Sequence, residues 1–288
     1  MTALYRDFTT QAEIDAEYNA ALSVPDFKAC ARHYVDTSAQ ARAQIKGMLD
    51  VPYGATLDET LDIFPADQPG APVFVFIHGG YWRSLTSKEF SFVAQGPRAL
   101  GITTVVVNYS LCPKVSIGEI VRQVRASVAW VLRNIAQYGG DPSRVSVGGH
   151  SAGGHLTAMC LQTEWARDYG LPQDPLVGAL MVSGLFDLRP LRYSYLQPAL
   201  QLDEETIQRC SPQFAVRKTA TPVLVTWGAL ESHEFARQST GYAQALSQTG
   251  GRAELMPQAG AHHFSAIHGF ADGADPLCQW IAKVSARG

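Results

Sequence analysis

The sequence predicts an α/β protein with a mostly parallel central sheet and helices on both of its faces. Short continuous apolar runs, such as residues 73–77 and 103–107, are typical of strands that are buried on both faces. Longer segments in which apolar residues recur at helical spacing, such as residues 117–138, separate these runs. This alternation of strands and helices favours parallel strands joined by helical crossovers.

The composition limits the classes of protein to which the chain can belong. Its 288 residues suffice for one large α/β domain, and we expect a single domain over residues 1–288. A net charge of −3 gives no support for a nucleic-acid partner. The longest apolar run is far too short to span a bilayer, so we expect no membrane partner. A homodimer is compatible with this composition.

The cysteines and the start of the chain predict a cytoplasmic location. The five cysteines are odd in number and widely spaced, and no pair forms C-x-x-C. This pattern is typical of a reduced protein without a disulfide framework. Residues 1–8 contain no apolar segment followed by a small-residue cleavage site, so we expect no signal peptide.

Residues 1–50 are predicted to form an N-terminal helical segment. Residues 11–22 and 38–49 place apolar side chains at helical spacing, and both stretches precede the first convincing strand. The sequence leaves open whether these helices pack under the sheet or lie over the end of the sheet that carries the site.

Strands and helices alternate after residue 50. The predicted strands are residues 60–64, 73–77, 103–107, 145–147, 177–182, 223–227 and 252–256. The predicted helices are residues 86–100, 117–138 and 152–169, a helix from residue 234 onward, and residues 276–286. Glycines end the first two of these helices. Residues 188–217 interrupt the alternation with prolines and tyrosines, and we expect them to form a small cap-like insertion over the site.

Ser151 is the candidate nucleophile because it lies at a sharp turn between a strand and a helix. It is the central residue of the G-x-S-x-G stretch from Gly149 to Gly153, which follows the apolar strand at 145–147. Such a turn strains the serine backbone and requires small residues two positions before and after it. The following helix directs its N-terminal N–H groups toward the same point.

The stretch His78–Trp82 directly follows the strand at 73–77 and is the candidate oxyanion loop. Loops at the carboxyl ends of parallel strands carry the chemistry of such sheets. The paired glycines Gly79 and Gly80 allow the backbone to turn its N–H groups inward. We expect the N–H groups of Gly80 and Tyr81, with that of Ala152, to face the oxyanion. His78 itself is expected to be structural and to hold the loop by hydrogen bonding.

Two carboxylates follow strands that come after the nucleophile in the chain. Glu231 follows the strand at 223–227, and Asp187 follows the strand at 177–182. We favour Glu231 as the residue that orients the base, because an acid on the later strand is the commoner order in this type of sheet. Asp187 is expected to pair with Arg189 or Arg192.

His263 is the preferred general base, and its neighbour His262 is the alternative. Both lie shortly after the last predicted strand, and Phe264 can pack down to hold the loop in place. A metal site at this pair, with His268 as a third ligand, is disfavoured because no acid or cysteine joins them at a known spacing. We therefore expect no metal and no cofactor.

The order Ser151, Glu231, His263 resembles the α/β-hydrolase fold. In detail the chain is similar to its kynurenine formamidase (arylformamidase) branch, which is close to the hormone-sensitive-lipase-like esterases. The stretches that carry this resemblance are His78–Trp82, Asn108–Pro113, Gly139–Pro142, Gly149–Gly154, Ser183–Leu188 and Glu231–Phe235. The first of them is the most specific, since the lipase-like relatives usually have a third glycine where Tyr81 stands. The family commonly has aspartate at the position of Glu231, and the longer side chain is a departure.

The resemblance implies a cofactor-free serine hydrolase that acts on a small-molecule amide or ester through an acyl-enzyme. The first expectation is an arylformamidase that cleaves a small-acyl aryl amide such as N-formylkynurenine. The alternatives are a short-chain carboxylesterase of the same fold and, from another class, a non-catalytic ligand-binding member.

Large aromatic residues near the predicted oxyanion loop suggest a small acyl group and a flat aromatic leaving group. Tyr81 and Trp82 are expected to narrow the acyl side of the site, unless they turn away and pack against the N-terminal helices. Phe186 and Phe264 are expected to contact the leaving group, together with tyrosines of the insertion. A substrate carboxylate would need a cation, and Arg83, Arg189 and Arg192 are equal candidates.

Overall fold

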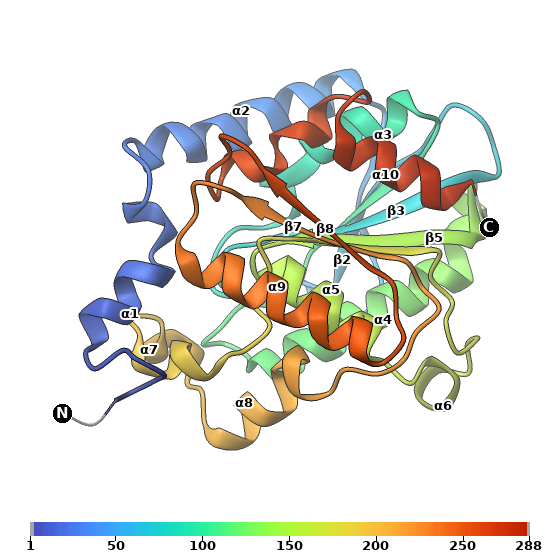
Figure 1. Ribbon diagram of the computed structural model, residues 1–288. Helices are drawn as coiled ribbons and strands as arrows, with labels where there is room; N and C mark the ends of the chain where they lie inside the picture. Colours follow the sequence, from blue (N-terminus) through green and yellow to red (C-terminus); the bar gives the residue numbers. More distant parts are fainter. Residues whose placement is uncertain (1–2, 287–288) are drawn as a thin grey trace.

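A computed structural model describes residues 3–286 and contains one eight-stranded sheet (Figure 1). Its strand order is β1-β2-β4-β3-β5-β6-β7-β8. The pairs β1–β2 and β2–β4 are antiparallel, and the pairs that join β4, β3, β5, β6, β7 and β8 are parallel. The strands are β1 (Met48–Pro52), β2 (Thr60–Phe64), β3 (Ala71–Ile77), β4 (Thr103–Val107), β5 (Gly140–His150), β6 (Gly178–Val182), β7 (Val223–Gly228) and β8 (Ala253–Gln258). The predicted mostly parallel sheet is confirmed.

Helices cover both faces of this sheet. The α-helices are α1 (Gln11–Tyr18), α2 (Phe27–Gln44), α3 (Gln95–Ala99), α4 (Ile117–Asn134), α5 (Ala152–Leu161), α6 (Trp165–Tyr169), α7 (Gln197–Leu200), α8 (Glu204–Cys210), α9 (His233–Gln248) and α10 (Pro276–Ser285). The 3-10 helices are η1 (Ala20–Leu22), η2 (Ser87–Ala94), η3 (Ile135–Tyr138), η4 (Arg189–Tyr193), η5 (Pro212–Phe214) and η6 (Ser265–Ala271). Figure 1 shows α2, α3 and α10 on one side of the sheet and α4, α5 and α9 on the other.

Two hydrophobic cores fill the space between the sheet and these helices, one on each face. Strand β3 contributes to both, because successive side chains of a strand point to opposite faces. Val73, Val75 and Ile77 belong to the core under α4, α5 and α9, whereas Phe74 and Phe76 belong to the core under α2 and α10. A strand buried on both faces therefore reads as a continuous apolar run, which is why the sequence revealed it.

The N-terminal region differs from its prediction. The second helix begins at Phe27 and ends at Gln44 instead of covering residues 38–49, and Asp26 caps its first turn. The stretch Met48–Pro52 is the edge strand β1, which pairs with β2. Four of its five residues are exposed, so it lacks the apolar pattern by which the buried strands were recognised. A single helix at residues 152–169 is also wrong, because α5 ends at Leu161 and α6 begins only at Trp165.

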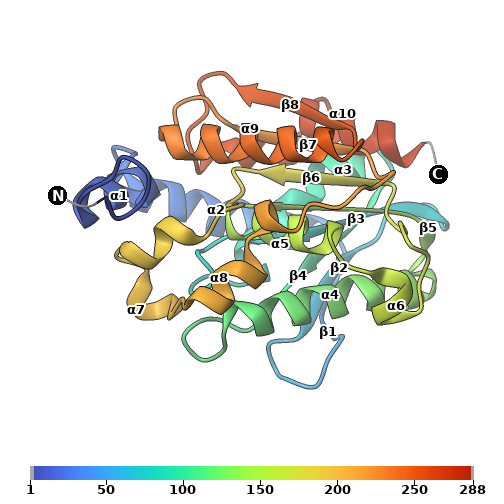
Figure 2. The same ribbon diagram turned by 60° about the horizontal axis from the view of Figure 1, so that its bottom comes forward.

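Helix α1 lies at the carboxyl ends of the parallel strands, whereas α2 packs on one face of the sheet (Figure 1 and Figure 2). In Figure 2 the arrowheads of β6 and β8 point toward the end of the molecule that carries α1. Residues 188–217 connect β6 to β7 through η4, α7, α8 and η5, and η4 contacts α1. No helix within residues 3–286 is both long and apolar enough to cross a bilayer.

Candidate active site

Ser151 lies at the turn between β5 and α5 in a strained backbone conformation. Its φ of 58° and ψ of −117° are rarely adopted by a residue with a side chain, and such a conformation costs about 1–3 kcal/mol. A Cβ on Gly149 would lie 2.4 Å from the carbonyl oxygen of Gly153. A Cβ on Gly153 would lie 1.9 Å from the carbonyl oxygen of Ile77. Both flanking glycines are therefore required by the tight packing of this turn against β3.

His263 and Glu231 form a buried pair on neighbouring loops. The Nδ1 atom of His263 lies 2.5 Å from Oε2 of Glu231, and both side chains are at most 5% exposed. The other carboxylate oxygen accepts hydrogen bonds from Ser183 Oγ at 2.5 Å and from the backbone N–H of Gly228 at 2.7 Å. Because an ionised carboxylate only accepts, Nδ1 carries the ring proton, and Nε2 is free to act as a base.

Asp187, the other candidate acid, is engaged elsewhere. Its carboxylate accepts hydrogen bonds from Arg189 at 2.6 Å and from the hydroxyl of Tyr5 at 2.9 Å. Burial alone would raise the pKa of Asp187, but the hydrogen bonds from Arg189 and Tyr5 outweigh it and hold the pKa below its ordinary value. The carboxylate of Asp187 is thus paired with Arg189, whereas the carboxylate that contacts His263 is that of Glu231.

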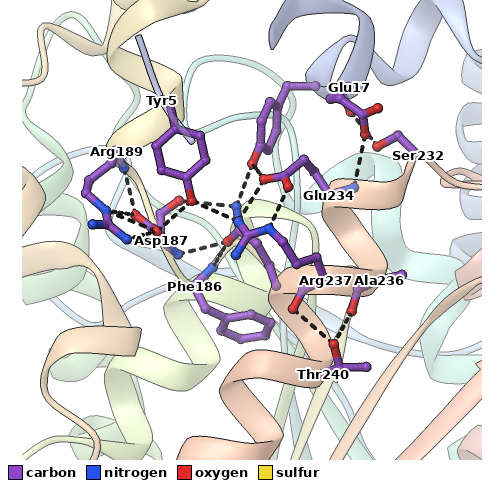
Figure 3. Close-up of polar contacts among 12 residues, drawn as sticks. Tyr5, Glu17, Phe186, Asp187, Arg189, Ser232, Glu234, Ala236, Arg237 and Thr240 are labelled. Carbon is purple, nitrogen blue, oxygen red and sulfur yellow. Dashed lines mark hydrogen bonds and ion pairs between the residues drawn. The ribbon is translucent and has the colours of Figure 1, made fainter. Parts of the chain in front are cut away.

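The same carboxylate belongs to a polar network that anchors the N-terminal segment. Figure 3 shows Tyr5 between the Asp187–Arg189 pair and Arg237. Arg237 also binds the carboxylate of Glu234, at 2.5 Å from Nε to Oε1. A second tyrosine of the N-terminal segment, Tyr18, donates to Glu234 at 2.6 Å. The network thus connects the N-terminal segment to α9 and to the loop after β6.

The loop after β3 has an unusual backbone. Gly80 has a φ of 111°, and a Cβ there would lie 2.1 Å from the carbonyl oxygen of Ser84. Tyr81 and Trp82 follow with φ values of 49° and 55°. Within residues 3–286, the backbone N–H groups of Gly80, Tyr81 and Ala152 donate no hydrogen bond. These N–H groups are available to a bound oxygen atom. Gly79 packs against the turn that carries Ser151, since a Cβ on Gly79 would lie 2.9 Å from the carbonyl oxygen of His150.

Two further histidines near the site are buried and structural. His78 stacks on Tyr109 with 4.2 Å between ring centroids, and burial lowers its pKa to about 4. His150 lies 2.9 Å, through Nε2, from the carbonyl oxygen of His263, and burial with the neighbouring His263 lowers the pKa of His150 well below its ordinary value. Neutral His150 therefore donates to the loop that carries His263 and holds its backbone in place.

A cavity of about 380 Å³ opens at Ser151 and His263. Aromatic side chains dominate its wall. The lining residues are Asn19, Ala20, Ala21, Phe27, Tyr34, Gly79, Gly80, Tyr81, Arg83, Ser84, Leu85, Phe90, His150, Ser151, Tyr195, His263 and Phe264. Both placements left open by the sequence occur: residues 19–21 and 27 line the cavity at the carboxyl ends of the strands, while α2 packs on one face of the sheet. The residues of the N-terminal segment that line the cavity were not predicted, because the spacing of apolar residues in a helix does not indicate which part of the protein the helix covers.

Of the four aromatic residues expected to bind substrate, two line the cavity and two do not. Tyr81 and Phe264 are part of its wall. Trp82 is fully buried away from it, and its indole N–H donates to Nδ1 of His155 at 3.3 Å. Phe186 is fully buried and stacks on Tyr242 at 4.3 Å between centroids. The expectation for Trp82 and Phe186 is corrected, because both rings contribute to the core under α5 and α9.

His262 is not placed like His263. Its Nδ1 accepts hydrogen bonds from the backbone N–H groups of Phe264 and Ser265, each at 3.2 Å. It does not line the cavity. Nor do residues 3–286 contain a cluster of three or more histidine, cysteine, aspartate or glutamate residues suited to a metal ion.

Comparison with known proteins gives concordant results. A family model described as the alpha/beta hydrolase fold matches residues 74–267. The chain is 34% identical over 255 residues to a kynurenine formamidase from Danio rerio, covering 86% of this chain and 85% of the relative. It is 28% identical to esterase LipQ from Mycobacterium tuberculosis, covering 70% of this chain and 53% of the relative. Among solved structures, a protein from Silicibacter sp. provisionally named a thioesterase superposes with a TM-score of 0.83 at 26% identity, covering 93% of this chain and 98% of that one.

Proposed function

The chain belongs to the α/β-hydrolase fold family and to its kynurenine formamidase-like branch, and on this premise we propose that Ser151, His263 and Glu231 are the catalytic triad of an arylformamidase. The observation that carries the proposal is the buried contact between His263 and Glu231 beside the cavity at which Ser151 stands. The aryl-formamide substrate is inferred from the 34% identity to a kynurenine formamidase over most of both chains.

In the proposed mechanism, Nε2 of His263 takes the proton of the Ser151 hydroxyl as the oxygen attacks the acyl carbon. Glu231 stabilises the imidazolium that forms. The N–H groups of Gly80, Tyr81 and Ala152 donate to the oxyanion, and the loss of one such donor costs about 3–4 kcal/mol of transition-state stabilisation. The imidazolium then protonates the leaving amine, and water hydrolyses the acyl-enzyme by the same route in reverse.

The cavity supports a small acyl group and a flat leaving group. Its volume of about 380 Å³ is near the lower end of the range of small-molecule sites, about 300–1,000 Å³. Tyr81, which belongs to the oxyanion loop, lines the acyl side, and Phe27, Tyr34 and Phe264 provide aromatic surface that suits an aryl ring. Because Trp82 is buried in the core, Tyr81 alone of the two narrows the acyl side of the cavity.

Two segments are proposed to cover the site. The N-terminal segment, residues 1–50, provides the wall formed by Asn19, Phe27 and Tyr34, and the insertion at residues 188–217 provides Tyr195. We propose that together they act as the cap of a single domain.

A cytoplasmic location and a homodimer remain predictions from the sequence.

Steady-state kinetics on N-formylkynurenine, beside nitrophenyl esters of increasing acyl length, tests the proposal. We expect cleavage of the formamide, and among the esters we expect kcat/KM to be highest for the formyl or acetyl ester. A kcat/KM that rises steadily up to the octanoyl ester, without formamide cleavage, would instead establish the alternative, a carboxylesterase like LipQ. Failure to cleave even a nitrophenyl acetate would indicate a non-catalytic ligand-binding member of the fold.

A further inference from the structure

One cationic side chain, that of Arg83, lies in the wall of the cavity. Arg83 follows the oxyanion loop directly, and it is the sole lysine or arginine among the residues that line the cavity in the described chain. Its guanidinium carbon lies 5.4 Å from the centroid of the Tyr195 ring. A guanidinium over an aromatic face is held by cation–π attraction, while its N–H groups stay available at the edge of the plane.

The other two arginines proposed for this role are neutralised by carboxylates. Arg189 is paired with Asp187 at 2.6 Å, and Arg192 with Glu204 at 3.2 Å. Neither of them lines the cavity. The structure therefore distinguishes among three residues that the sequence left equivalent.

Arg83 has no such partner. Among residues 3–286, no carboxylate lies within ion-pair distance of its guanidinium. Asp15 is nearby in the fold, but its oxygens accept the backbone N–H of Tyr195 at 2.7 Å and the side-chain amide of Gln11 at 3.1 Å. The positive charge in the cavity wall is thus available to a ligand.

We propose that Arg83 is the anion subsite that recognises the carboxylate on the leaving group of the substrate. The inference rests on the proposed hydrolase function and names the residue that selects carboxylate-bearing substrates over neutral ones. Guanidinium binds carboxylate through two parallel N–H···O bonds, which Tyr195 favours by fixing the plane of the fork. Because the carboxylate does not change in the reaction, Arg83 binds it equally in the ground state and the transition state, and loss of Arg83 raises KM more than it lowers kcat.

The test compares substrates that differ in one carboxylate. N-formylkynurenine is paired with its decarboxylated analogue N-formylkynuramine, and 4-acetoxybenzoate with phenyl acetate. We expect Arg83→Gln to lower the ratio of kcat/KM between carboxylate and neutral partner about 10–100-fold, mainly through KM. Arg83→Lys retains the charge but not the fork, so its ratio should lie between those of wild type and Arg83→Gln. Arg192→Gln, outside the cavity, is the matched control.

The two substrate pairs separate the possible failures. An unchanged ratio in Arg83→Gln, or equal losses on both members of each pair, would overturn the anion subsite. If wild type cleaves only the esters, the formamidase proposal fails, and the ratio between 4-acetoxybenzoate and phenyl acetate still reports on Arg83. Thermal unfolding of each variant shows whether a uniform loss reflects a folding defect.

Discussion

The hydroxyl of Tyr81 donates a hydrogen bond to the carbonyl oxygen of Tyr18, and this contact joins the oxyanion loop to the N-terminal helix. The adjacent carbonyl, that of Glu17, accepts the hydroxyl of Ser232 at 2.6 Å, next to Glu231. Two consecutive residues at the end of α1 therefore contact both the loop after β3 and the loop after β7. The N-terminal helix is part of the framework that positions the site.

Replacement of Tyr81 by phenylalanine removes the hydrogen bond to Tyr18 but keeps the ring. A typical net hydrogen bond contributes about 1 kcal/mol, so kcat should fall about fivefold as the backbone N–H of Tyr81 loses its fixed position. Steady-state kinetics on a short ester measures this change. Tyr193→Phe, on an exposed residue of the insertion, should leave kcat as it is. Equal values of kcat for wild type and Tyr81→Phe would disprove the positioning role.

Ser151→Ala should lower turnover roughly a million-fold and leave the fold intact, because loss of one member of a triad can cost as much as loss of all three. His263→Ala should have a similar effect, and His262→Ala a milder one, since His262 bonds only to its own loop. Turnover of N-formylkynurenine and circular dichroism would be measured on each variant. A folded Ser151→Ala protein with near-normal activity would refute the mechanism.

The two carboxylates should separate activity from stability. Glu231→Gln should lower kcat on the order of 10⁴-fold, because the base loses the group that fixes its tautomer. Asp187→Asn should retain much more activity but lower the free energy of unfolding by about 1–3 kcal/mol, because Arg189 and Tyr5 lose a charged partner. Kinetics and urea unfolding of both variants provide the comparison. A larger loss of kcat in Asp187→Asn would reverse the assignment.

Extended treatment with a strong chelator should leave activity intact. The proposed chemistry uses serine, histidine and glutamate side chains with backbone N–H groups, and the described residues offer no cluster suited to a metal ion. Activity on a short ester would be measured before and after dialysis against the chelator. Loss of activity that zinc restores would show that the histidine pair at 262–263 had been misinterpreted.

The protein should lose stability as the pH falls from about 6.5 toward 5, before most carboxylates titrate. Burial lowers the pKa of His78 and of His155 to about 4, from an ordinary value of 6.5. In this window both histidines bind protons in the unfolded chain but not in the folded one, so the free energy of unfolding decreases with each step down in pH. Urea unfolding at several pH values gives the slope, which should exceed one proton per molecule. A flat profile would contradict these pKa values.

Much of the fold was readable from the sequence because the relevant patterns are local. The buried strands of the parallel sheet are continuous apolar runs, and β2 and β4 have the predicted bounds. The G-x-S-x-G stretch around Ser151 is recognisable from residue type and spacing alone, although the clash that excludes a side chain at Gly153 is with Ile77 of the neighbouring strand β3. The exposed strand β1 has no such pattern, and it was missed for that reason.

The sequence by itself determined the strand–turn–helix around Ser151 and a short set of candidate acids, bases and cations, since those features follow from residue type and local spacing. Tertiary structure alone decided among the candidates. Glu231 contacts His263 while Asp187 contacts Arg189, and Arg83 enters the cavity while Trp82 turns into the core. These choices depend on contacts between segments far apart in the chain, and side-chain direction within a loop has no periodicity from which a sequence could predict it.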